Sequence, residues 1–260
     1  MDSHRRVCAR GDTLGPVETA EQVLERLGPH AALTHESAAR RHGLELVVDS
    51  GVERVTVPRN RGRARATGWR IHRSALGAGD ADVDDDGLRL STPARTVADL
   101  CRVLPLDHAV AAADSALRQQ LVPLEVLRHG LLPALGSGAS RLRAVGRLMD
   151  PRSESVLESL LRVLLAVSGL PEPVPQYEVR DGSGRQVARV DLCWPGLRLV
   201  VEADGFAFHS DRGSYRRDRA RSNELERLGW RVLRFTWEDV VGRPASVVAL
   251  VADCLRLAWA

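Results

Sequence analysis

The chain has 260 residues, enough for two domains, and its 44% hydrophobic and 27% charged residues are typical of a globular protein. No apolar run approaches the roughly 18 residues that a membrane-spanning helix needs, and no apolar signal segment follows the N-terminus. We therefore expect a cytoplasmic protein without a membrane partner. The net charge of +3 is too small to argue for nucleic-acid binding by itself, and all 37 basic residues are arginine.

The first half is predicted to begin with a loose tail over residues 1–17 and then to combine helices with a pair of strands. Alternating apolar residues between Val47 and His72 predict the two strands, with the arginine-rich stretch between them as a hairpin loop. The acidic segment 77–87 is predicted to be a solvated loop. Apolar residues at helical spacing predict helices over residues 18–27, 35–42, 93–104, 106–119 and 123–129, and a short helix ending at Met149.

The second half follows the order helix, strand, strand, strand, helix, strand, helix. The first helix begins after Ser155, and the later elements are predicted over residues 176–179, 185–194, 197–203, 214–228, 230–235 and 244–258. This order predicts the α/β class, with a mixed sheet flanked by helices and preceded by a smaller α+β domain. With Asp150-Pro151 as the boundary, we expect one domain over residues 18–150 and another over residues 151–260.

Three acids, Asp191, Glu202 and Asp204, border the apolar run LRLVV in the second half. Strict alternation in VARVDLCW places the apolar residues around Asp191 on one strand face and its carboxylate on the other. If Pro195-Gly196 forms a tight turn, Asp191 lies opposite Val200. Glu202 is then its diagonal neighbour, with the two Cβ atoms roughly 7–8 Å apart.

Two carboxylates at that distance repel each other unless a cation lies between them. A hard divalent cation such as Mg²⁺, or Mn²⁺ in its place, takes carboxylate oxygens and can help to hydrolyse a phosphodiester. Asp191 and Glu202 are therefore the predicted metal ligands, and Asp204 lies beside Glu202 on the same strand face. The alternative is a partly exposed edge on which Asp191 pairs with Arg189 or Arg198.

Four further side chains are candidates for the same site. His209 can shuttle a proton or contact a phosphate, although a loop histidine can equally be solvated. Glu158 can orient a metal-bound water, or it can simply be the capping partner of Ser155. Arg217 and Arg221 share a helix face and can bind consecutive phosphates, or form a solvated face.

The segment 59–73 carries six arginines and no acid. Its exposed loop would present Arg61, Arg63 and Arg65 to a phosphate backbone, which makes DNA the expected partner. The alternative is a basic loop screened by salt.

Four segments of the second half resemble, in their order, the very-short-patch-repair (Vsr)-like endonuclease domains of the PD-(D/E)XK superfamily. They are SESVLESLLRVLL, VARVDLCWP, LVVEADGFAFH and YRRDRARSNELERLGWRVLRFTWEDV. The resemblance covers about residues 154–257. It implies Asp191 and Glu202 as metal-binding acids, Glu158 as the first-helix glutamate and His209 as the histidine that follows the DG pair.

The superfamily pattern often has a lysine at the position that Asp204 occupies in this sequence. Arginine cannot act as a base in its stead because it stays protonated. His209 is then the nearby group able to take that part. A degenerate copy that binds DNA without cutting it is the alternative.

The first half is similar to the domain of AbiEi-type abortive-infection antitoxins and their relatives. The segments that carry this similarity are ALTHESAARRHGL, VERVTVPRNRGR, WRIHRSAL and STPARTVADLC. The similarity implies a DNA-associated accessory domain over roughly residues 31–127.

Together these observations predict a Mg²⁺-dependent DNA endonuclease or nickase that hydrolyses phosphodiester bonds, in phage defence or DNA repair. The alternative function is a non-catalytic DNA-binding transcriptional regulator, or antitoxin-like protein, with a degenerate nuclease fold. A homodimer is an open alternative to a monomer, since nucleases of this fold that cut both strands often pair.

Overall fold

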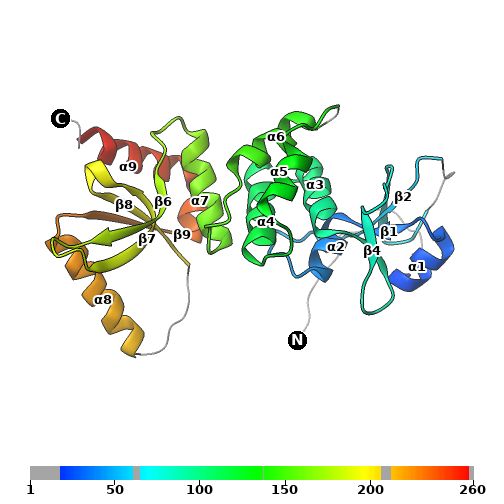
Figure 1. Cartoon of the computed structure of the whole chain (residues 1–260), viewed down its shortest axis with the longest axis horizontal. Helices are drawn as coiled ribbons and strands as arrows, with labels where there is room; N and C mark the ends of the chain where they lie inside the picture. The colour runs from blue at the N-terminus through cyan, green and yellow to red at the C-terminus, as the bar shows by residue number, and fades with distance from the viewer. Residues whose placement is uncertain (1–17, 61–64, 137, 206–211, 258–260) are drawn as a thin grey trace, which may run out of the picture. The chain divides into compact units, whose positions relative to one another are not determined.

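The computed structural model of the chain describes residues 18–60, 65–136, 138–205 and 212–257, without the side chains of 212–218 and 257. The predicted tail over 1–17 lies outside this part. The chain divides into two compact units (Figure 1). Unit 1 comprises Met1–Ala38 and Asp49–Thr96, and unit 2 comprises Ala39–Val48 and Val97–Ala260. In the described part, no helix has both the length and the apolar character needed to cross a membrane.

Unit 1 is built on a five-stranded mixed sheet in the order β3-β2-β1-β5-β4. Its strands are β1 (Ala32–Leu33), β2 (Glu53–Val57), β3 (Trp69–Arg73), β4 (Ala81–Val83) and β5 (Arg89–Ser91). Helix α1 (Ala20–Leu27) begins at a capping box between Thr19 and Gln22, and buries its apolar face against β2. Helix α2 (His35–Arg41) follows β1.

Two predictions for unit 1 were wrong. Strands β2 and β3 run parallel, with Val55 opposite Ile71, and do not form a hairpin. Apolar alternation is the same in both directions, so it could not reveal that β3 starts beside the first residue of β2. The acidic segment is a β4–β5 hairpin, because the Asp84 carboxylate accepts the backbone N–H groups of Asp86 and Leu88 and shapes its turn.

The helical part of unit 2 confirms the predicted helices to within a few residues. It contains most of α3 (Pro93–Val103), then α4 (Leu106–Arg118), α5 (Leu124–Leu131), α6 (Ala139–Leu148) and α7 (Val156–Val167). Helices α4 and α7 pack together around the fully buried Asp114, which pairs with Arg162 at 2.6 Å. The domain division at Asp150 stays a prediction.

The second sheet has the order β6-β7-β8-β9 and supports the candidate site. Its elements are β6 (Val174–Arg180), β7 (Gln186–Trp194), β8 (Leu199–Asp204), α8 (Arg212–Arg227) and β9 (Arg231–Thr236), followed by α9 (Pro244–Leu257). Only the β8–β9 pair is parallel, which requires a crossover, and α8 lies in that connection.

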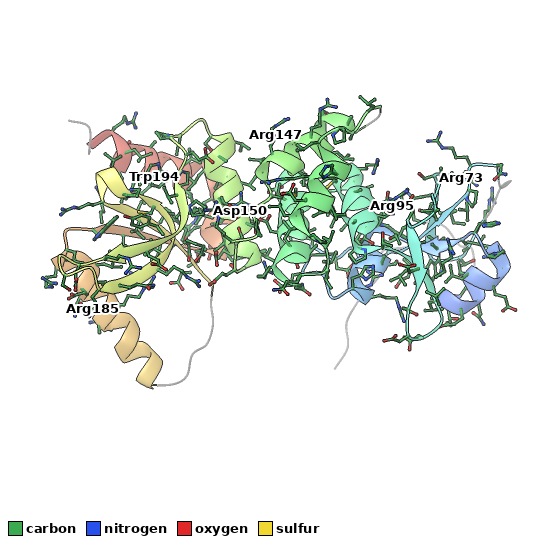
Figure 2. The ribbon with its side chains drawn as sticks, viewed as in Figure 1. Arg73, Arg95, Arg147, Asp150, Arg185 and Trp194 are labelled. Atoms are coloured by element: carbon green, nitrogen blue, oxygen red, sulfur yellow. The ribbon has the colours of Figure 1, made fainter. Side chains whose placement is uncertain are left out.

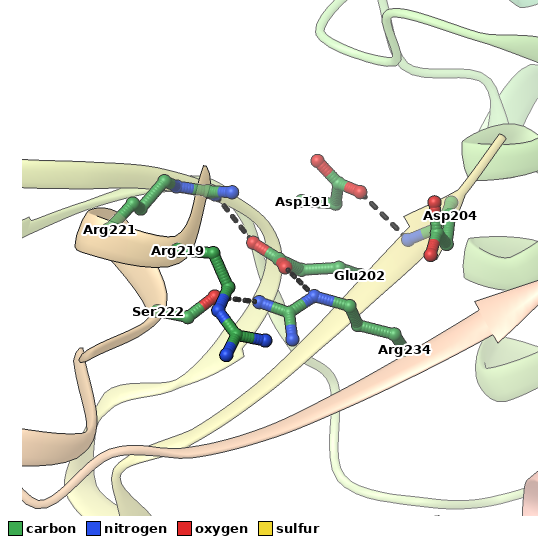
Figure 3. A pocket seen from close by; sticks show the side chains of 8 residues that line it. Asp191, Glu202, Asp204, Arg219, Arg221, Ser222 and Arg234 are labelled. Carbon is green, nitrogen blue, oxygen red and sulfur yellow. Dashed lines mark hydrogen bonds and ion pairs between the residues drawn. The ribbon is translucent and has the colours of Figure 1, made fainter. Parts of the chain in front are cut away.

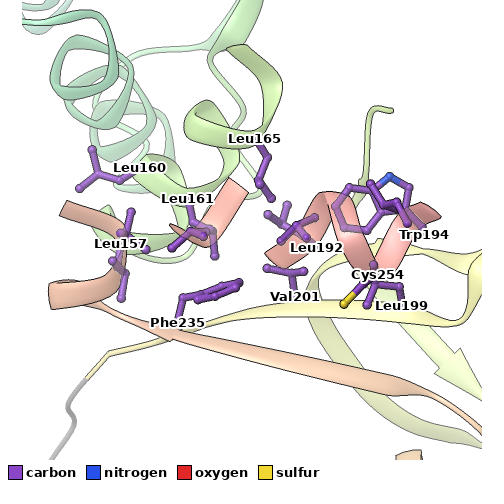
Figure 4. Packing of buried hydrophobic residues seen from close by; sticks show 14 residues of the cluster. Leu157, Leu160, Leu161, Leu165, Leu192, Trp194, Leu199, Val201, Phe235 and Cys254 are labelled. Carbon is purple, nitrogen blue, oxygen red and sulfur yellow. The ribbon is translucent and has the colours of Figure 1, made fainter. Parts of the chain in front are cut away.

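Helices cover both faces of this sheet. On one face, α7 and α9 bury leucines and valines against Val201 and Phe235 (Figure 4). Trp194 of β7 (Figure 2) belongs to the same cluster. Its indole N–H donates to the Pro171 carbonyl at 2.9 Å. On the other face, Leu225 of α8 packs on Val200. The predicted fold class is confirmed: mixed sheets flanked by helices, with the C-terminal sheet after an earlier α+β region.

Candidate functional site

The connection between β7 and β8 differs from the predicted tight turn. Pro195–Leu197 forms a short 3₁₀ turn, and Arg198 follows in the left-handed region with φ of 48°. Two-residue hairpin turns need a positive φ at their first central position, which the proline ring forbids. The longer turn shifts the register, so Asp191 does not lie opposite Val200 as predicted.

The new register brings the two predicted metal ligands face to face. The last pair of the β7–β8 ladder is Leu192 with Val201, and one step further along it Asp191 stands across from Glu202. The strands separate at this point, where the Asp191 carboxylate accepts the backbone N–H of Ala203 at 2.8 Å. The site is therefore built where a ladder ends, and a side chain satisfies the next backbone donor.

Side-chain alternation along β7 is interrupted at Asp191. Val190 packs in the cluster that contains Leu225 of α8, whereas Leu192 packs in the cluster formed by α7 and α9. The prediction that these apolar neighbours share one face was wrong. Irregularities of this kind often re-aim a side chain near functional sites.

Glu202 is buried, with 6% of its surface exposed, and lies between two guanidinium groups (Figure 3). Arg221 of α8 donates to one of its oxygens at 2.5 Å, and Arg234 of β9 donates to the other at 3.0 Å. Arg221 also donates to the Arg189 carbonyl, and Arg234 to the Ser222 hydroxyl. Glu202 thus fixes two arginines at the site.

An open pocket of about 400 Å³ lies over these groups (Figure 3). Acidic and basic side chains line it together, and the full set is Asp191, Glu202, Ala203, Asp204, Arg219, Arg221, Ser222 and Arg234. Such a mixture suits a ligand that carries anionic oxygens and a cation at once.

The charge of Asp191 is less compensated than that of its neighbour Glu202. Burial, followed by the charges of Glu158 and Glu202, raises the pKa of Asp191 to about 7, against the opposing effects of the Ala203 N–H and Arg221. Asp191 accepts a hydrogen bond from the backbone, whereas Glu202 accepts from two cations. A cation bound here would therefore interact more strongly with Asp191 than with Glu202.

Glu158 stands on the first turn of α7, where Ser155 caps its N–H as predicted. Its carboxylate accepts two hydrogen bonds. One of its oxygens accepts the Glu154 N–H and the Gln176 side-chain amide, both at 2.9 Å. Burial raises the pKa of Glu158.

The donors fit a hard divalent cation, although no ready-made cluster of ligands is present. In the described residues no group of three or more His, Cys, Asp or Glu side chains is placed to hold a metal. A carboxylate offers about four lone-pair sites, so Glu202 can keep both arginines and still face a cation. Asp191 and Glu202 therefore suit a cation such as Mg²⁺, which fills the rest of its shell with water.

The remaining predicted residues have different outcomes. Asp204 is exposed at the rim of the pocket, and Arg221 reaches into it. His209 and the side chain of Arg217 lie outside the described part of the structure. Sequence reasoning missed Arg219, Arg234, Ser222 and Gln176 as neighbours of the acids. Arg234 could have been found only from the parallel register that sets it beside Glu202.

A basic hollow of about 630 Å³ lies on unit 1 and is lined in part by residues of the arginine-rich segment 59–73. Arg26, Arg65 and Arg73 line it together with Trp69 and Glu18, and Glu18 pairs with Arg26 at 2.9 Å. Arg65 is exposed, whereas Arg61 and Arg63 lie outside the described residues.

Comparison with known proteins supports a nuclease-like domain at the C-terminus. The restriction-endonuclease-like family model REase_MTES_1575 matches residues 174–255. That segment contains Asp191, Glu202 and every other residue that lines the pocket. Glu158, on the preceding helix, lies outside it.

Two proteins of Mycobacterium tuberculosis are similar to the chain over a longer stretch. They are the uncharacterized protein MT2308 of strain CDC 1551/Oshkosh and the uncharacterized protein Rv2248 of strain ATCC 25618/H37Rv. Each is 32% identical over 166 residues, which are 63% of this chain and 61% of the relative. The match thus spans about three fifths of the relatives' length. No solved structure matches the chain.

Proposed function

We propose that unit 2 is a metal-dependent DNA endonuclease or nickase that hydrolyses phosphodiester bonds. The observation that carries the proposal is the opposition of Asp191 and Glu202 in an arginine-lined pocket. The restriction-endonuclease-like match over residues 174–255 supports the same chemistry. More specifically, we propose that this domain is a Vsr-like endonuclease, as the resemblance implies.

Asp191 and Glu202 would hold Mg²⁺ or Mn²⁺. When bound, such a cation polarises a phosphoryl oxygen and makes an attacking hydroxide available near neutral pH. Asp191 contributes the larger uncompensated charge, and Glu158 lies close enough to raise its pKa. Asp204, at the rim, is placed to contact water or substrate.

The arginines would bind and orient the scissile phosphate. A guanidinium group presents paired N–H donors to phosphate oxygens and keeps its charge, so it stabilises negative charge without accepting a proton. Arg219 and Arg234 line the pocket, and Glu202 holds Arg234 in place. Proton transfer then falls to the acids or to His209, whose part stays a prediction.

The second candidate function is DNA binding without cleavage, as in a regulator or antitoxin-like protein. It is favoured by the pairing of both Glu202 oxygens with arginines, together with the absence of lysine from the sequence. In that case the arginines that line the pocket, Arg219, Arg221 and Arg234, would bind phosphates. The acids would only orient these arginines.

Unit 1 would help to hold the DNA. We propose that Arg61, Arg63 and Arg65 contact its backbone, as the antitoxin-like resemblance of this half implies. Arg65 also lines the basic hollow. The remaining proposals are a cytoplasmic location, a role in phage defence or repair, and a homodimer if both strands are cut.

The test is cleavage of supercoiled plasmid and of single-stranded DNA by the purified full chain, with Mg²⁺, Mn²⁺ or EDTA. Asp191→Ala and Glu202→Ala are the site variants, and Asp253→Ala on the exposed side of α9 is the control. Metal-dependent nicking that only the site variants lose supports the nuclease. Intact DNA under every condition, with metal-independent DNA binding, supports the second candidate.

A further inference from the structure

Gln176 has a backbone conformation that is rare inside a strand. Its φ is 51°, and among the described non-glycine residues with positive φ it is the one that lies within a strand. Left-handed conformations are unfavourable for residues with a Cβ atom and persist where the surrounding structure fixes them. A specific role of the Gln176 side chain would account for the persistence of this left-handed conformation.

The register places Gln176 directly across from Asp191. The pairs Pro175 with Leu192 and Tyr177 with Val190 flank this position, which is itself missing from the ladder. The irregular residue on β6 thus coincides with the position on β7 where side-chain alternation is interrupted. Both deviations meet at the candidate site.

The partly buried Gln176 side chain has a specific partner. Its Nε2 donates to Glu158 at 2.9 Å, on the same oxygen that accepts the Glu154 N–H. An amide donor fixes a carboxylate without neutralising it. The contrast is Glu202, whose charge is opposed by two arginines.

We propose that Gln176 is a positioning residue that holds Glu158 as a third carboxylate beside Asp191 and Glu202. The proposal rests on the proposed metal-dependent function. The left-handed backbone of β6 directs the amide to α7, the amide fixes the orientation of Glu158, and Glu158 adds negative charge to the cation site. Glu158 then acts on the cation through its charge and through the water around the cation, not as a direct ligand.

The test compares two glycine substitutions that relieve similar backbone strain in the full chain. Gln176→Gly removes the contact with Glu158, whereas Gln120→Gly acts at a second left-handed residue, with φ of 58°, in the turn after α4. Calorimetry measures Mn²⁺ affinity, and thermal unfolding measures stability without metal. We expect both variants to match or exceed the melting temperature of the wild type.

Gln176→Gly should weaken Mn²⁺ binding by roughly 10-fold or more, as for other partners of metal ligands, and Gln120→Gly should not. In a Glu158→Gln background, Gln176→Gly should add no further loss, because its effect passes through Glu158. The positioning role alone is overturned if Gln176→Gly binds Mn²⁺ as tightly as the wild type. It is also overturned if Gln176→Gly lowers Mn²⁺ affinity as much in the Glu158→Gln background as it does in the wild type. Absence of Mn²⁺ binding by the wild type, or its persistence in Asp191→Asn, overturns the proposed function and this role with it.

Discussion

Asp191 and Glu202 face each other at the end of the β7–β8 ladder, yet their charges are balanced in different ways. Glu202 accepts from two guanidinium groups, and Asp191 accepts from the backbone N–H of Ala203. The Glu202 carboxylate therefore stabilises the fold around it, whereas the Asp191 carboxylate holds charge that a bound cation would neutralise. The two acids should respond differently to substitution.

Replacing Asp191 by asparagine should stabilise the metal-free protein at pH 8. Burial and the charge of Glu158 raise the pKa of Asp191 from 3.8 to about 7, so the folded state retains a proton that the unfolded chain releases. The stability linked to that proton is present below pH 3.8 and is lost as pH rises through 7. We expect the melting temperature of Asp191→Asn to exceed that of the wild type by roughly 2–4 °C at pH 8, with the difference vanishing toward pH 4.

The matched control for this prediction is Asp253→Asn, at an exposed carboxylate on α9. It should leave the melting temperature unchanged at both pH values. Equal melting temperatures for wild type and Asp191→Asn at pH 8 would contradict the conclusion that the charge of Asp191 is uncompensated in the metal-free protein.

Replacing Glu202 by glutamine should have the opposite effect on stability. The Glu202 side chain is 8% exposed, and the substitution weakens its charge-assisted bonds with Arg221 and Arg234. We expect a loss of about 1–2 kcal/mol in the free energy of unfolding, measured by urea titration at pH 7. Glu154→Gln, whose side chain is 52% exposed in its pair with Arg189, should change nothing measurable. An unchanged free energy of unfolding in Glu202→Gln would mean that the pairs of Glu202 with Arg221 and Arg234 contribute no stability.

Breaking the buried pair between α4 and α7 should destabilise unit 2 strongly. Burial raises the pKa of Asp114, and Arg162 opposes that shift from 2.6 Å away. Arg162→Leu leaves the Asp114 carboxylate buried without its cation, at an expected cost of about 3–5 kcal/mol in chemical denaturation. Arg152→Leu, which removes a half-exposed arginine from its pair with Asp150, is the control and should be far milder. Similar losses in the two variants would refute the argument from burial.

Substituting Arg61, Arg63 and Arg65 by glutamine should weaken DNA binding and its dependence on salt. Each phosphate contact that is lost should reduce the slope of log affinity against log salt by about 0.9 for duplex DNA. Fluorescence anisotropy between 50 and 200 mM NaCl measures this slope. A control triple variant at the exposed Arg128, Arg180 and Arg256 keeps the net charge change equal. An equal reduction in both variants would assign the effect to overall charge, not to this loop.

Sequence periodicity predicted the helices and most strands because burial imposes it on every amphipathic element. Strand direction is a different matter, since β3 alternates in the same way whether it runs parallel or antiparallel to β2. The short strands β4 and β5 were missed because their acids suggested a solvated loop, whereas Asp84 shapes a hairpin turn.

The candidate site was predicted only as a set of acids. Asp191 and Glu202 were found from their position around an apolar strand, but their opposition depends on the turn at Pro195–Leu197 and its extra residues. Gln176 and Arg234 reach the acids from strands and registers that no local pattern encodes. Long-range register therefore accounts for most of what sequence reasoning left out.

The positive wall of the pocket consists of arginine, and this determines how an assay should vary with pH. Arg219, Arg221 and Arg234 form this wall, and an arginine side chain does not act as a base in a protein. A lysine in their place could lose its proton and add a falling alkaline limb to the rate profile. If the described pocket residues alone govern turnover, the rate at limiting cation should rise with pH, because the cation competes with a proton for Asp191, and should then stay level without an alkaline fall.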